Sequence, residues 1–196
     1  KSTVCRRVVD LVRSRGLVAG GIVTERRVDD NSPLCAECVT SGKRNRGGRP
    51  KAAHDPAEPP GFPLGRVVGA GLDVVDVATD ERRPLAELDR VTGGPTTGRW
   101  HFHPAALVFG LAGCGRVPPE ALLVIDELGP LELVQHQGWA PLVPLLRAHI
   151  GPVMVVVRPS LIAPFLVLAE GRHPDTVEVT RAERDALPPI IFARLG

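Results

Sequence analysis

The sequence predicts one α/β domain over residues 1–196, with a mostly parallel sheet covered by helices. Three features predict this fold: an amphipathic helix at the start of the chain, β-branched runs that alternate with helical segments, and one strongly apolar run that ends in two acidic residues. Strands that alternate with helices favour a parallel sheet, because parallel neighbours need a long crossover connection. With 43% hydrophobic side chains, 196 residues are enough to build one such core.

The first predicted element is a helix over residues 2–14. Its apolar side chains recur at helical spacing and share one face, at Val4, Val8, Leu11 and Val12. Arginines occupy the other faces, and Gly16 ends the helix.

Lys1-Ser2-Thr3 stands at the start of this helix and matches the end of the phosphate-loop pattern G-x-x-x-x-G-K-[ST]. In that pattern the lysine, here Lys1, reaches the β- and γ-phosphates, and the hydroxyl beside it, here Ser2, binds Mg²⁺. No glycines precede Lys1 in the sequence. We therefore interpret the chain as beginning inside the phosphate loop of a P-loop NTPase-like fold, with the first strand and the glycine loop missing.

Two β-branched runs, at residues 17–28 and 66–78, predict the next strands, with glycines as bends or close backbone approaches. Between them, residues 29–64 are rich in Pro, Gly, Lys and Arg and poor in large apolar side chains. Such a segment cannot bury much surface, so it predicts a flexible insertion within the domain.

The second half of the chain continues the alternation. We expect a helix at 104–113, a buried parallel strand at 122–126, a helix at 139–150, a buried strand at 153–157, a helix at 160–169 and a short last strand at 176–179.

Asp126 and Glu127 follow the apolar run at 121–125. Ligands of open parallel sheets bind beyond the carboxyl ends of the strands, which is where this run would place both carboxylates. Asp126 is suited to hold Mg²⁺, and Glu127 to orient or deprotonate an attacking water. The alternative is a solvated turn; the Lys1-Ser2-Thr3 helix start in the same chain favours the site.

The composition argues against several classes of protein. A net charge of +2, from 24 basic and 22 acidic residues, gives no electrostatic case for a nucleic-acid or membrane partner. No apolar stretch reaches the roughly 18 residues of a membrane span. Four cysteines, only two of them closely spaced, do not form a disulfide framework, which favours a reducing, cytoplasmic location.

Several motifs together resemble one family. They are Gly20-Gly21-Ile22-Val23-Thr24-Glu25, Leu72-Asp73-Val74-Val75-Asp76, Gly98-Arg99-Trp100, the string from Ile125 to Leu133, and the string from Val179 to Pro188. Their order is similar to that in the thermophile-type nucleoside-triphosphatases, also called cancer-related NTPases. The most specific element is Asp-Glu-Leu-Gly-Pro-Leu-Glu-Leu, at residues 126–133.

The resemblance implies an additional-strand P-loop fold and slow, Mg²⁺-dependent hydrolysis of ATP, GTP and other nucleoside triphosphates. By position, it implies that Lys1, Ser2 and Thr3 contact phosphate and metal. It also implies that Asp126 is the metal carboxylate and Glu127 the general base.

Two further residues are weaker candidates for the nucleotide site. Arg26, after Thr24-Glu25, could stabilise charge on the γ-phosphate, or it could simply be a solvated strand end. Trp100 could stack on a nucleobase, although core packing is the more common role of a tryptophan.

Cys35 and Cys38 form a C-x-x-C motif inside the insertion, with His54 as a third candidate ligand. Such a motif could hold Zn²⁺ or an iron–sulfur cluster if further ligands converge. Otherwise the two residues are surface thiols.

The main functional hypothesis is therefore a nucleoside-triphosphate phosphohydrolase. One alternative is a nucleotide-gated regulator or metal-cofactor accessory protein that contacts a client protein through residues 29–64. Another is a nucleotide kinase, for which residues 44–49 are the only arginine-rich candidate lid.

Overall fold

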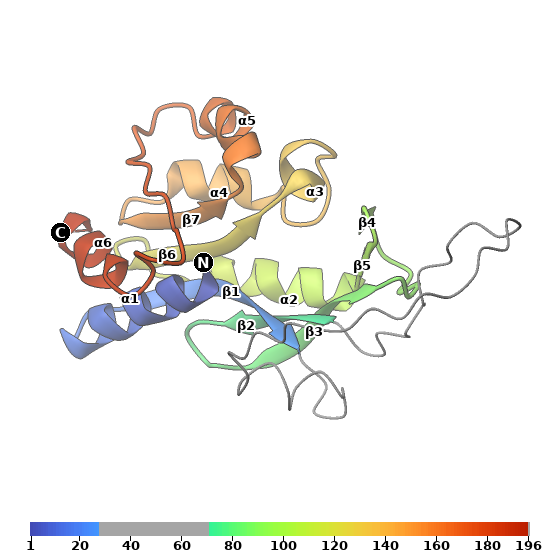
Figure 1. Cartoon of the computed structure of the whole chain (residues 1–196), viewed down its shortest axis with the longest axis horizontal. Coiled ribbons are helices and arrows are strands. Elements are labelled where there is room, and N and C mark those ends of the chain that lie inside the picture. The colour runs from blue at the N-terminus through green and yellow to red at the C-terminus, as the bar shows by residue number, and fades with distance from the viewer. Residues whose placement is uncertain (28–70, 196) are drawn as a thin grey trace, which may run out of the picture.

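The computed structural model describes residues 1–27 and 71–195, and it shows a seven-stranded sheet with helices on both faces (Figure 1). The strand order is β4-β5-β3-β2-β1-β6-β7. The predicted α/β class with a helix-covered sheet is confirmed. The predictions on the insertion, including Cys35, Cys38, His54 and the 44–49 lid, lie outside the described residues.

The sheet is parallel on one side of β1 and antiparallel on the other. β1 (Ala19–Arg27), β6 (Leu122–Leu128) and β7 (Val153–Val157) run parallel. β2 (Gly71–Asp76) and β3 (Arg82–Leu88) form an antiparallel hairpin beside β1. β5 (Trp100–Phe102) and β4 (Thr96–Thr97) extend this antiparallel wing.

The wing from β3 to β5 was not predicted. β4 and β5 have only two and three residues, and β3 begins with Arg82-Arg83-Pro84, which gives a weak strand signal because proline donates no ladder hydrogen bond. The close turn after β2 makes the hairpin possible, since antiparallel neighbours need only a short connection.

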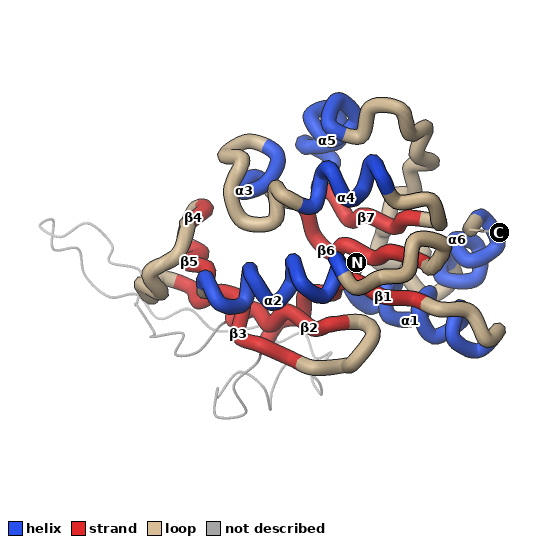
Figure 2. Tube along the Cα trace, turned by 180° about the vertical axis from the view of Figure 1, so that it is seen from behind, coloured by secondary structure: helices blue, strands red, loops and turns tan. Residues whose placement is uncertain are grey.

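Two hydrophobic cores lie on the two faces of the sheet. Helix α1 (Ser2–Ser14) packs with α6 (Leu187–Arg194) on one face, where the apolar positions predicted for the first helix are buried, Leu11 only partly. Helices α2 (Pro104–Gly115), α4 (Leu142–Ala148) and α5 (Ile162–Leu168) contribute to the other core, and Figure 2 shows α2 and α4 on that face. Short α3 (Pro130–Leu133) and the turn η1 (Pro159–Leu161) complete the described elements.

The predicted last strand at 176–179 is wrong: these residues have no regular structure. Val177 and Val179 instead pack against the core beneath α1, so their alternating apolar pattern is satisfied by face packing and not by pairing. The strand at 153–157 is confirmed, but it is half-buried because β7 is the edge of the described sheet. Helix α6 was not expected, since Pro188 and Pro189 in its first turn obscure the helical pattern.

Within the described residues, every helix is too short or too polar to cross a lipid bilayer.

Candidate active site

The carboxyl ends of the three parallel strands meet the N-terminus of α1. β6 carries Asp126 and Glu127 to this edge, and the neighbouring β1 carries Thr24, because Ile22 is in register with Ile125. Arg158 follows directly after β7. Lys1 is the N-cap of α1. Five side chains from four separate parts of the sequence therefore surround one end of the sheet.

Asp126 is almost completely buried, with 1% of its surface exposed. The backbone N–H of Thr24 donates to its Oδ2 over 3.3 Å, and the Thr24 hydroxyl donates to its backbone oxygen. Burial raises the pKa of the Asp126 carboxyl, and hydrogen bonds from the Ser2 hydroxyl and the Thr24 N–H partly oppose that rise. Ser2 and Asp126, the two predicted metal ligands, therefore lie close enough for the Ser2 hydroxyl to stabilise the Asp126 carboxylate.

Glu127 is held by two cations. Lys1 Nζ lies 3.0 Å from its Oε2, and Arg158 Nε lies 2.7 Å from its Oε1. Burial by itself would raise the pKa of Glu127, but hydrogen bonds from Arg158 and Lys1, together with their charges, lower the pKa below its ordinary value. Glu127 is therefore a carboxylate anion with a separate cationic partner on each oxygen.

Arg158 was missed by the sequence analysis. The signal that could have found it is its position, because a basic residue that follows a parallel strand reaches the same sheet edge as Asp126 and Glu127.

The chain resembles a known nucleoside-triphosphatase in sequence. No family model matches the chain. The chain is 27% identical over 163 residues to the nucleoside-triphosphatase THEP1 of Methanosarcina acetivorans, an alignment that spans 74% of this chain and 86% of that protein. The chain is thus similar to a nucleoside-triphosphatase of the thermophile type.

The fold agrees with this relationship. The crystal structure of THEP1 from the hyperthermophile Aquifex aeolicus matches with a TM-score of 0.57 at 14% identity, covering 96% of this chain and 90% of that one. The chain thus has the P-loop NTPase fold of the thermophile-type enzymes.

The tail of the family-like string at 126–133 has a structural role. Glu132 is buried and accepts hydrogen bonds from the backbone N–H groups of Gly129, over 2.9 Å, and Trp139, over 3.2 Å. Trp139 is itself buried and donates its Nε1–H to the oxygen of Leu107 on α2. Glu132 therefore ties the segment that leaves the site after Glu127 to the core below α2.

Glu132 gives a testable pH dependence of stability. Burial raises its pKa, and its backbone hydrogen bonds oppose this only in part. The folded protein therefore retains a proton that the unfolded chain has lost, so the free energy of unfolding should fall as pH rises above the ordinary glutamate value of 4.5. Urea unfolding from pH 4.5 to neutral should show a smaller fall for Glu132→Gln, which has no such proton to lose.

Glutamine can accept only one of the two N–H groups, so Glu132→Gln should also be less stable at every pH. The measurement that decides is therefore how steeply the free energy of unfolding changes with pH. Glu170→Gln, at an exposed glutamate, is the control that should keep the wild-type slope. Identical slopes for wild type and Glu132→Gln would contradict the assignment.

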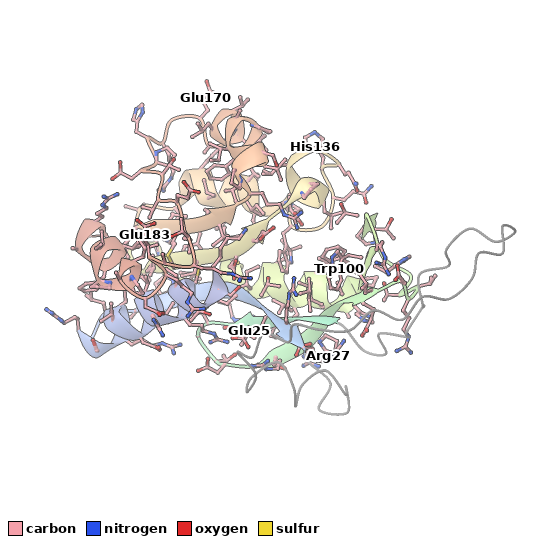
Figure 3. The ribbon with its side chains drawn as sticks, in the orientation of Figure 1. Glu25, Arg27, Trp100, His136, Glu170 and Glu183 are labelled. Carbon is pink, nitrogen blue, oxygen red and sulfur yellow. The ribbon has the colours of Figure 1, made fainter. Side chains whose placement is uncertain are left out.

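Arg26, Trp100 and Thr3 do not join this cluster. Within residues 1–27 and 71–195, no hydrogen bond or ion pair joins any of the three to Asp126 or Glu127. Arg26 and Thr3 have exposed side chains, at the end of β1 and on α1 respectively. Trp100 is half-buried on β5 and packs against the core, at the wing end of the sheet (Figure 3).

The residue after Arg26 does have partners. Arg27 donates to Glu87 Oε1 over 2.6 Å and lies 3.5 Å from Asp73. Glu25 accepts from Arg6 of α1 over 2.9 Å and from Arg82 of β3 over 2.8 Å. These ion pairs tie α1 and β1 to the antiparallel wing (Figure 3).

No group of three or more His, Cys, Asp or Glu side chains within residues 1–27 and 71–195 could hold a metal ion. Any metal at the site described above would therefore depend on Asp126 together with hydroxyl, phosphate or water oxygens.

Proposed function

We propose that this chain hydrolyses nucleoside triphosphates to diphosphate and phosphate with Mg²⁺, at the edge of the sheet where α1 meets β6. The relationship to a nucleoside-triphosphatase supports phosphohydrolase activity in general. The observation that carries the assignment to this site is the contact of Lys1 with Glu127 over 3.0 Å, at the edge of the sheet where Ser2 lies near Asp126. The contact brings together the residues that we propose as the phosphate-binding cation, the metal ligands and the general base.

Ser2 and Asp126 fit Mg²⁺ because both offer oxygen atoms, the donors this ion prefers, and the Ser2 hydroxyl lies near the Asp126 carboxyl. When bound there, Mg²⁺ would neutralise charge on the phosphate oxygens.

Lys1 and the start of α1 suit the phosphates themselves. Val4 N–H and Cys5 N–H both donate to the Lys1 oxygen, so the helical hydrogen bonds begin there and leave the N–H groups of Ser2 and Thr3 without an acceptor within the helix. Free N–H groups at a helix N-terminus attract anions. On binding, the Lys1 ammonium would exchange the Glu127 carboxylate for phosphate oxygens.

Glu127 suits the role of general base. Its carboxylate would accept a proton from water as the water oxygen attacks the γ-phosphorus and the bond from that phosphorus to the bridging oxygen breaks. An anionic carboxylate is the form required for this step, and a glutamate with an ordinary pKa of 4.5 is already in that form at neutral pH.

Lys1→Ala tests the phosphate role. This substitution should weaken triphosphate binding at least about tenfold, because it removes a charge-assisted hydrogen bond. Calorimetry with a non-hydrolysable triphosphate and Mg²⁺ measures it. Arg7→Ala is the matched control: it removes a cation from the same helix that is paired with Asp185 over 2.6 Å.

Equal affinities for Lys1→Ala and Arg7→Ala would overturn the phosphate site. Turnover measured with and without nucleoside monophosphates separates a hydrolase from a kinase. Phosphate release without an acceptor is expected, and diphosphate formation only in the presence of an acceptor would identify a kinase.

A further inference from the structure

Arg158 lies at the candidate site but belongs to none of the motifs quoted above, and the proposed function gives it no role. It donates through Nε to Glu127 Oε1 over 2.7 Å, while Lys1 occupies Oε2 of the same carboxylate over 3.0 Å. The two partners come from different elements: Lys1 from the start of α1, and Arg158 from the end of β7. They can therefore move independently.

The backbone around Arg158 is fixed. Val157, the residue before it, pairs with Leu128 just beyond Glu127, so β7 and β6 hold the two side chains at the same level of the sheet. The Arg158 oxygen accepts the N–H of Leu161 over 2.9 Å, which closes the turn η1. The side chain thus reaches Glu127 from a constrained anchor, unlike a residue on a long loop.

The Lys1 ammonium cannot stay paired with Glu127 Oε2 and also bind the phosphates of a nucleotide. If Lys1 turns to the nucleotide, Oε2 of Glu127 loses its partner while Oε1 keeps Arg158. The carboxylate then has one oxygen held in place and one free to accept a proton from water. A single bond from Nε achieves this, whereas a bidentate arginine would occupy both oxygens.

We infer that Arg158 is a positioning residue, which holds Oε1 of Glu127 while Lys1 leaves Oε2 for the phosphates of the bound nucleotide. This inference rests on the proposed function. Arg158 acts through Glu127 and does not itself contact the triphosphate.

Arg158→Ala should therefore lower kcat roughly 10-fold to 100-fold, the scale of a misplaced catalytic group. Affinity for a non-hydrolysable triphosphate should change by less than about twofold, because no binding contact is lost. Arg158→Lys should recover part of the lost kcat, since an ammonium can still pair with Oε1. A loss of affinity comparable to the loss of kcat would overturn the inference and indicate direct phosphate contact.

A double-mutant cycle with Glu127→Gln is the decisive test. If Arg158 acts only through Glu127, adding Arg158→Ala to the Glu127→Gln variant should leave kcat within about twofold of the single Gln variant. A further drop as large as in the wild-type background would overturn the inference.

The pair Arg83 and Glu81 on the wing is the matched control, because Arg83 has 57% of its side chain exposed against 56% for Arg158 and also binds one carboxylate. Arg83→Ala should leave kcat unchanged, and similar melting temperatures for the two Ala variants would exclude a general loss of structure. Wild-type protein without any triphosphatase activity would contradict the proposed function itself, whereas normal wild-type turnover with an unaffected Arg158→Ala variant would contradict only the role of Arg158.

Discussion

Glu127→Gln should lower kcat for triphosphate hydrolysis about 100-fold or more, the usual scale for loss of a general base. The amide cannot take the proton from the attacking water. Binding should persist or become tighter, because the Lys1 ammonium no longer has to leave a carboxylate that lies 3.0 Å away. Single-turnover hydrolysis, together with calorimetry of a non-hydrolysable triphosphate, separates the two effects.

Glu81→Gln provides the control for Glu127→Gln. Glu81 is a carboxylate paired with one arginine on the wing, so its replacement should leave both kcat and affinity near wild type. If Glu127→Gln hydrolyses triphosphate at the wild-type rate, Glu127 is not the base. If it fails to bind nucleotide, Glu127 has a structural or metal-binding role in place of the proposed one.

Gly21→Ala should destabilise the fold by at least about 3 kcal/mol, a cost typical of backbone strain combined with a steric clash. Gly21 lies in β1 with φ of +106°, a conformation that residues with a Cβ rarely adopt. An added Cβ would lie 2.0 Å from the backbone oxygen of Val124 on β6. Since Val124 is paired with Gly21 in the parallel ladder, neither strand can move without breaking the register.

Gly16→Ala separates the cost of the backbone conformation from the cost of the steric clash. Gly16 also has positive φ, at +73°, but a Cβ there meets no atom within 4 Å. Its replacement should cost only about 1 kcal/mol, from the backbone conformation alone. Urea unfolding measures both variants, and equal costs would show that the approach of β1 to β6 at Val124 is not as close as described.

Gly21→Ala should also weaken triphosphate binding in the fraction of protein that stays folded. Thr24, three residues further along β1, holds both the carboxylate and the backbone of Asp126. A shift of β1 against β6 would displace that contact, so the predicted metal carboxylate would lose its support.

Much of the fold could be predicted from local sequence patterns. The helical spacing of Val4, Val8 and Val12 marks the face that α1 buries, and the apolar run before Asp126 marks a strand buried on both faces. Such patterns record burial, which is a property of each segment. They also placed Asp126 and Glu127 at a strand end, and the likeness to a known family supplied the expected chemistry.

The same patterns could not identify which segments pair or pack with one another. Residues 176–179 have an apolar alternation that fits a strand, yet they pack on the face of the sheet, because alternation fixes which side chains are buried and not what covers them. The antiparallel wing was missed for the related reason that β3, β4 and β5 are stabilised by pairing with their neighbours more than by their own composition.

The sequence by itself determined that this chain has a phosphate-loop-like helix start and an acidic strand end. Only the tertiary structure decided which of their atoms pair, and that Arg158 joins them. Lys1 and Arg158 are 126 and 31 residues from Glu127. Contacts of that range depend on how whole strands are ordered in the sheet, and the order is set by the packing of both cores at once, which no local stretch of sequence encodes.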